Sequence, residues 1–200
     1  MEHREEIDGL RAIAVIPVIL YHAGFSTFSG GFIGVDVFFV ISGFLITSII
    51  LKDLNSGEFR LAHFYERRAR RILPALSLVM FVCLLAAWVF MDPHNYALLS
   101  RSMVATSTFS SNVYFYLVSG YFDIASDEKP LLHTWSLAVE EQFYIIVPFC
   151  LGYFWYQKNR NLVLVLALAC ITSVITSVVL SYYPGNANFI SCFQEPGNCW

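Results

Sequence analysis

Charged residues are scarce in this sequence, which leaves little to cover the surface of a soluble domain. Of its 200 residues only 14% are charged, whereas 57% are hydrophobic, and the mean hydropathy is +0.60. Long apolar runs with so few charges are typical of polytopic membrane proteins and disfavour a soluble globular domain. The net charge of −3, with no basic stripe outside one loop, gives no indication of a nucleic-acid partner.

Several chemical signatures are also missing. No spacing of cysteine and histidine resembles a zinc site, so we expect no metal centre. Ser136 does not lie in a G-x-S-x-G motif, which disfavours a serine nucleophile. The first apolar run has no obvious small-residue cleavage site, and we interpret it as a retained anchor. Cys192 and Cys199 lie in a polar tail, where a disulfide can form if that tail is extracytoplasmic.

What the sequence does contain is a series of apolar runs of membrane-spanning length. These candidate spans, each near the roughly 20 residues that a membrane helix needs, cover about 9–25, 32–52, 72–91, 139–157 and 162–182. We therefore expect an all-α polytopic transmembrane bundle with about five or six spans. The Ser- and Thr-rich segment 97–119 is left open as a re-entrant helix, an interfacial helix or a sixth span.

The basic loops predict how the bundle is oriented. Positive charge gathers in the loop 52–71 and in the short loop 158–160. The positive-inside rule places both loops on the cytoplasmic side. The N-terminus is then cytoplasmic, and the segments 26–31, 92–138 and 183–200 lie outside. This topology places the protein in the inner (plasma) membrane as a multi-pass protein.

The first span carries two groups that are costly in hydrocarbon, Arg11 and His22. Eleven residues correspond to about three helical turns, so both side chains project from one face, roughly 16 Å apart along the axis. Arg11 can hold a phosphate-bearing group near the cytoplasmic entrance, and His22 can take a proton from a hydroxyl nearer the outer side. The alternative is that Arg11 snorkels to the headgroups or pairs with Asp8, while His22 caps the far interface.

Later segments contain further candidates. In the second span, Gly30, Gly31 and Gly34 permit close helix packing, and Asp36 can orient His22 or close a buried ion pair. The cytoplasmic motif RxxR places Arg67 and Arg70 on one face of a helix starting near Ala62, suited to phosphate or simply to anionic lipid. At the fourth span the adjacent acids Glu140 and Glu141 diverge by about 100°, and one is a candidate catalytic, orienting or capping acid.

Four stretches, in this order, resemble the membrane acyltransferase-3 family, whose members O-acetylate surface polysaccharides. They are IDGLRAIAVIPVILYH with R-x10-H at Arg11 and His22, GGFIGVDVFFVISGFLIT around Asp36, Ser42 and Gly43, FYERRARRILPAL with Arg67 and Arg70, and LLHTWSLAVEEQFY with Glu140 and Glu141. The resemblance covers about residues 5–160. It is close to the branch that carries a C-terminal extracytoplasmic SGNH hydrolase-like domain.

The resemblance implies a mechanism. Family members take an acetyl group from cytoplasmic acetyl-CoA, pass it across or within the membrane domain, and deliver it to a sugar hydroxyl outside. Arg11 and His22 would form the central pair, with His22 as the acyl-accepting or general-base group, and Asp36 would support them. Glu140, chosen over Glu141, would be the acid of its motif. Arg67 and Arg70 would hold coenzyme A, and we assign Ser42 and Gly43, a small break in the second span, to the same site.

The expected partners are therefore a surface polysaccharide or oligosaccharide, the lipid bilayer and an SGNH domain. Family membrane domains have about ten spans, so we expect residues 1–200 to be the N-terminal part of such a domain. Two alternatives belong to other classes. In a transporter or export subunit, the same charged residues line a substrate or proton path. In a non-catalytic remnant, they have no function beyond membrane insertion.

Overall fold

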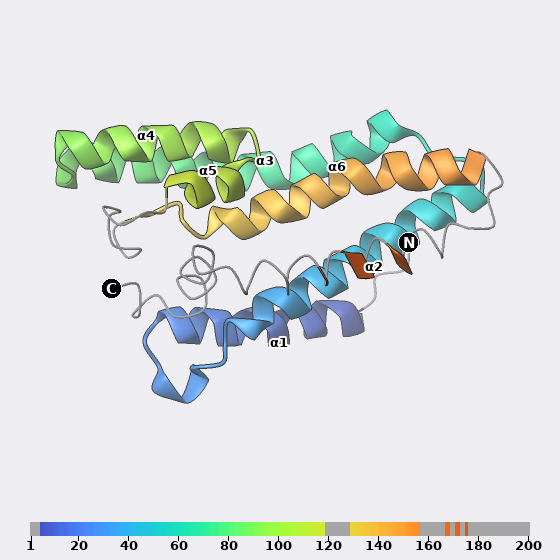
Figure 1. Ribbon diagram of the computed structural model, residues 1–200, viewed down its shortest axis with the longest axis horizontal. Coiled ribbons are helices and arrows are strands. Elements are labelled where there is room, and N and C mark those ends of the chain that lie inside the picture. Colours follow the sequence, from blue (N-terminus) through green and yellow to red (C-terminus); the bar gives the residue numbers. More distant parts are fainter. Residues whose placement is uncertain (1–4, 119–128, 157–166, 169–170, 173–174, 176–200) are drawn as a thin grey trace.

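The computed structural model describes residues 5–118 and 129–156, together with residues 167, 168, 171, 172 and 175. These residues form helices and contain no strand, so the predicted all-α fold is confirmed. The long elements are α1 (Glu5–His22), α2 (Ile33–Asn55), α3 (Leu61–Phe90) and α6 (Thr134–Tyr156). The short ones are the 3-10 turn η1 (Ser26–Phe28), α4 (Pro93–Ser107) and α5 (Ser111–Val118). In Figure 1, α1 lies beside α2, whereas α4 and α5 pack beside one end of α3.

The α1–α2 hairpin is held together by close contact between the two backbones. A Cβ atom at Gly31 would overlap the carbonyl oxygen of Pro17, and one at Gly34 would overlap the carbonyl oxygen of Ala14. Glycine at these two positions therefore sets how closely the helices approach, as small residues do in membrane helix pairs. Gly30, in contrast, has open space around it. The close approach that we predicted is confirmed for Gly31 and Gly34 only.

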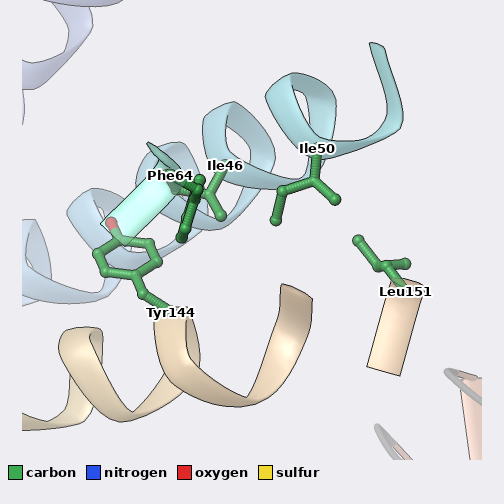
Figure 2. Close-up of a cluster of buried hydrophobic side chains, with 5 residues drawn as sticks. All are labelled: Ile46, Ile50, Phe64, Tyr144 and Leu151. Atoms are coloured by element: carbon green, nitrogen blue, oxygen red, sulfur yellow. The ribbon is translucent and has the colours of Figure 1, made fainter. Parts of the chain in front are cut away.

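The core lies where α2, α3 and α6 meet. Figure 2 shows its buried side chains: Ile46 and Ile50 from α2, Phe64 from α3, and Tyr144 and Leu151 from α6. Ile50 is fully buried and Tyr144 is 1% exposed. These large side chains hold three segments together that are far apart in the sequence.

The contacts also give the direction of each helix. Gly43 faces Phe143, and further along Ile50 shares a cluster with Leu151, so α2 and α6 run parallel. The Tyr65 hydroxyl donates to the carbonyl oxygen of Ile145 at 3.1 Å. Because Arg68 meets Glu141 one turn earlier on α6, α3 runs antiparallel to α6. These directions agree with the alternation that the basic loops predict.

The Ser- and Thr-rich segment is divided between α4 and α5, of 15 and 8 residues. At about 1.5 Å per residue neither is long enough to cross a bilayer, so the sixth-span interpretation is wrong. Polar side chains tie both helices to α6. The Ser111 hydroxyl donates to the carbonyl oxygen of Thr134 at 2.9 Å, and the Asn112 and Gln142 amides bond each other at 3.0 and 3.1 Å. These hydroxyls and amides therefore fix the start of α6 against its neighbours.

Three helices of the described residues are long and apolar enough to cross a membrane: Ile33–Asn55, Leu61–Phe90 and Thr134–Trp155. Large apolar side chains cover the outer surface of α3; Trp88 is 78% exposed and Phe90 is 85% exposed, as suits lipid contact. α1 has 18 residues but begins with the charged sequence EEIDGLR, which keeps it out of this set. The predicted span 162–182 lies mostly outside the described residues, as do most of the loop 121–130 and the Cys192–Cys199 pair.

Candidate functional site

Arg11 faces the α1–α2 contact. Its guanidinium carbon lies 6.0 Å from the ring centroid of Phe38, and one terminal nitrogen lies 3.8 Å from a carboxylate oxygen of Asp8. The Nε atom of Arg11 is buried and has no hydrogen-bond partner among the described residues. The pairing with Asp8 that we predicted is present, but it leaves one donor of Arg11 unused.

His22 is the last residue of α1, and its ring folds back onto the same helix. Its Nδ1 lies 2.8 Å from the carbonyl oxygen of Val18. Because a carbonyl oxygen can only accept, Nδ1 must donate, and the lone pair of the neutral ring lies on Nε2. The ring is also flanked by Tyr21 and His133, at centroid distances of 5.0 and 4.5 Å. His22 therefore has one defined atom, Nε2, that can accept a proton or an acyl group.

Asp36 lies in the first turn of α2 and is exposed. Within the described part of the chain it makes no hydrogen bond and no ion pair, and it does not contact His22. The structure therefore does not bring together the pair that we predicted. The carbonyl of Val18 orients the imidazole of His22 instead.

Arg67 and Arg70 lie in the first turns of α3, at the end of the bundle opposite His22. α3 begins at Leu61, within one residue of the predicted start. Arg67 lies 3.6 Å from Asp53 and its side chain is 51% exposed, whereas Arg70 lies 2.8 Å from Glu66 and is 79% exposed. Both guanidinium groups can reach a phosphate from solvent, because surface ion pairs of this kind are weak.

Ser42 and Gly43 do not lie near these arginines. Ser42 is 1% exposed, and a Cβ atom at Gly43 would lie 3.7 Å from the Phe143 ring, in the contact between α2 and α6. Eleven residues of helix, about 16 Å, separate Ser42 from Asp53, which pairs with Arg67. The two parts of the predicted coenzyme site are therefore apart. The buried Ser42 hydroxyl has no hydrogen-bond partner among the described residues.

Glu140 and Glu141 both point into the protein, although neighbouring positions on a helix diverge. The reason is Arg68, which lies 3.1 Å from Glu141 and 3.8 Å from Glu140. Its guanidinium also covers the Tyr144 ring, and the Tyr144 hydroxyl donates to Glu140. The side chains of Arg68, Glu140 and Glu141 are 14%, 13% and 10% exposed. We name these four residues the Arg68 cluster.

Our sequence reasoning missed Arg68, Tyr144 and His133. Arg68 could have been found, since it lies four residues after the buried Phe64 and four before the half-buried Ile72, on the inner stripe of α3. Instead the RxxR spacing drew attention to Arg67 and Arg70. His133 had no such signal, because nothing in the sequence shows that the start of α6 lies beside the end of α1.

The rest of the described structure offers no competing site of the same kind. No group of three metal-binding side chains occurs within it. A small apolar hollow between α4 and α5, lined by residues such as Leu98, Ser102 and Phe115, includes none of the predicted site residues.

Comparison with known proteins decides the family. The profile of the acyltransferase domain, acyltransferase-3, matches residues 4–194, nearly the whole chain. The chain belongs to the acyltransferase-3 family. The resemblance that the four motifs predicted is thereby confirmed. No solved structure matches this acyltransferase-3 chain significantly.

Among curated proteins, this acyltransferase-3 chain is similar to peptidoglycan O-acetyltransferase OatA of Listeria monocytogenes. The two are 43% identical over 184 residues, which is 90% of this chain and 29% of the relative. It is also 41% identical over 187 residues to YrhL of Bacillus subtilis, and 36% identical over 184 residues to O-acetyltransferase OatA of Staphylococcus aureus. These alignments cover 28% and 30% of those two relatives. The chain thus spans less than a third of the curated relatives that it matches.

Proposed function

We propose that this protein is a membrane-bound O-acyltransferase that moves an acetyl group from cytoplasmic acetyl-CoA to a hydroxyl of peptidoglycan outside the plasma membrane. The family and the relatives named for O-acetylation of peptidoglycan support the reaction class. The observation that carries the proposal is the tautomer of His22. Its Nδ1 donates a hydrogen bond to the carbonyl oxygen of Val18, which leaves the lone pair of Nε2 able to accept a proton. An imidazole fixed in this tautomer is suited to act as a general base.

In this reaction the sugar hydroxyl gives its proton to Nε2 of His22 while its oxygen forms a bond to the acetyl carbonyl carbon. The bond between that carbon and the sulfur of acetyl-CoA breaks, a step that requires the thioester end of acetyl-CoA to reach His22. Protonated His22 gives its proton to the thiolate that leaves, so the products are an O-acetyl ester and free coenzyme A. His22 ends neutral, as it began, which is the requirement for a general base that turns over.

The arrangement of charged groups supports a reaction that runs from one end of the bundle to the other. Arg67 and Arg70 lie at one end, and we propose that they hold the phosphates of coenzyme A on the cytoplasmic side. His22 lies at the other end, and the 23 residues of α2 between them span about 34 Å, close to the thickness of a bilayer core.

Arg11 and Glu140 lie between these two ends. Arg11 is eleven residues from His22, and Glu140 is seven residues from His133, which correspond to about 16 Å and 10 Å along the helix axes. We propose that Arg11 acts on the acyl group between the two ends of the bundle. The Arg68 cluster holds Glu140 in place between these ends.

The test is the O-acetyl content of peptidoglycan in a deletion strain, measured by mass spectrometry. The strain carries the full reading frame, its His22→Ala variant, or a His94→Ala variant as the control, because His94 is an exposed histidine of α4. We expect acetylation with the parent and the control and none with His22→Ala, at equal protein levels in the membrane.

Acetylation that persists in His22→Ala would overturn the proposal. Movement of substrate across the membrane that does not depend on acetyl-CoA would favour the transporter reading instead. No effect of any of these substitutions, together with no acetylation by the parent, would favour the remnant.

A further inference from the structure

His133 lies immediately before α6, and the fold places its ring against that of His22. The two ring centroids are 4.5 Å apart and the ring planes meet at 79°, an edge-to-face contact. His22 ends α1, and within the described part of the chain its ring also contacts the Val18 carbonyl and Tyr21 of the same helix. His133 therefore links the end of α1 to a segment that is far away in the sequence.

Among the described residues, the groups that contact the two histidines are aromatic rings, a hydroxyl and backbone carbonyls. Tyr21 on α1 presents its ring to His22, and the Ser136 hydroxyl on α6 donates to the carbonyl oxygen of His133. η1 contains only Ser, Thr and Phe. Asp36, the acid at this end of α2, is exposed and makes no contact with either ring among the described residues. Within the described part of the chain, His22 is the nearby titratable group that acts on His133.

The surroundings favour a neutral His133. Although His133 is exposed, the atoms packed around it and then the nearby His22 lower the pKa of His133. Both causes disfavour the imidazolium form. His133 therefore stays neutral in a pH range where an ordinary histidine, with a pKa near 6.5, takes up a proton.

We propose that His133 is a positioning residue for His22: it packs against the His22 ring and, as a neutral imidazole, lets His22 become charged when it takes the proton of the sugar hydroxyl. This inference rests on the proposed role of His22 as general base. A neutral ring beside His22 accommodates the new positive charge, whereas a protonated His133 would repel it. Activity therefore requires both histidines to be neutral before the reaction starts.

The first experiment measures acetyl transfer to a soluble glycan acceptor by the purified full-length protein from pH 5 to pH 8. If two groups take up protons in this range and either proton stops the reaction, the logarithm of the rate falls with decreasing pH at a slope that approaches about 2. If only one group does so, the slope is about 1. Because His133 stays neutral through this range, we expect a slope of about 1 for the parent and the same slope for His133→Phe. His94→Phe is the control and should keep the slope of the parent.

The same variants separate packing from charge. At pH 8, His133→Phe keeps an aromatic ring beside His22 and should retain activity within about threefold. His133→Ala removes the ring and should lower kcat by about 10- to 100-fold at an unchanged KM for acetyl-CoA. A slope near 2 in the parent, which would mean that His133 takes up a proton in this range, or full activity of His133→Ala, would overturn the proposal.

A second experiment does not depend on acetyl transfer. Diethyl pyrocarbonate acylates neutral imidazole, and mass spectrometry reports the modification of each histidine. Between pH 7 and pH 5.5 we expect His133 to lose less of its reactivity than a free histidine peptide in the same sample, with a smaller difference in His22→Ala. Equal titration of His133 and the free peptide would refute a neutral His133 even if the protein is an acetyltransferase. An inactive parent in which His133 alone stays reactive would overturn the proposed function but leave the histidine pair standing.

Discussion

Replacing Arg68 by methionine should destabilise the protein far more than replacing Arg70 in the same way. Arg68 and Glu141 form an ion pair at 3.1 Å with side chains only 14% and 10% exposed. Arg68→Met leaves Glu141 buried without its cation, a change that costs about 3–5 kcal/mol in buried pairs. The pair of Arg70 and Glu66 is a surface pair four residues apart on one helix, 79% and 54% exposed. Such pairs contribute only about 0.3–0.5 kcal/mol.

The assay is thermal unfolding of the detergent-purified protein. At roughly 2–4 °C per kcal/mol for a domain of this size, Arg68→Met should lower Tm by about 6–20 °C and Arg70→Met by less than about 2 °C. The double variant Arg68→Met/Glu141→Gln removes the orphaned charge and should regain part of the loss. Glu140 loses Arg68 in both Arg68 variants but keeps the bond from the Tyr144 hydroxyl in both, so it is a constant background when these two variants are compared.

Equal shifts in Arg68→Met and Arg70→Met would refute the reasoning, because burial would then make no difference. A double variant no more stable than Arg68→Met would also count against it, since the loss would come from packing over Tyr144 and not from the charge of Glu141.

Two further predictions concern helix packing and donor binding. Gly34→Ala forces a methyl group into the backbone of α1 and should cost about 1–3 kcal/mol, whereas Gly43→Ala meets Phe143 at an ordinary 3.7 Å and should shift Tm little. Thermal unfolding of both variants checks this, and equal losses would contradict it. Arg67→Gln and Arg70→Gln should each weaken acetyl-CoA binding roughly 10- to 100-fold, the effect of one charge-assisted hydrogen bond. Binding measured by titration calorimetry would be unchanged in the control Arg101→Gln, and unchanged binding in all three would refute the donor site.

Helix type and approximate position followed from local pattern. The apolar runs predicted α2 and α6 because their length and hydropathy suffice by themselves. The start of α3 near Ala62 followed from the helical spacing of its arginines. The predicted span 9–25 corresponds to α1, which is not among the three helices that are long and apolar enough to cross a membrane, since its first two turns carry four charged residues, Glu5, Glu6, Asp8 and Arg11. The sequence pattern also left the assignment of residues 97–119 open, because Ser and Thr are compatible with both a membrane span and a surface helix.

The site was predictable only where a motif lies within one helix. Arg11 and His22 share α1, so their separation followed from the sequence alone. Contacts between different helices did not follow from the sequence. Asp36 was expected beside His22 because an isolated acid in a span is costly, but it lies on the exposed face of α2. Arg68 reaches Glu140 and Glu141 because α3 and α6 run antiparallel, and no single stretch of sequence carries that information.

The packing of Gly31 and Gly34 against α1 has a consequence for how this part of the chain can move. Because the two backbones touch, α1 cannot rotate or slide along α2 without a collision at Pro17 or Ala14. The hairpin therefore moves as one rigid unit. The edge-to-face contact between His22 and His133, in contrast, joins the end of α1 to the segment before α6 through side chains alone, so these two rings can separate without any backbone collision.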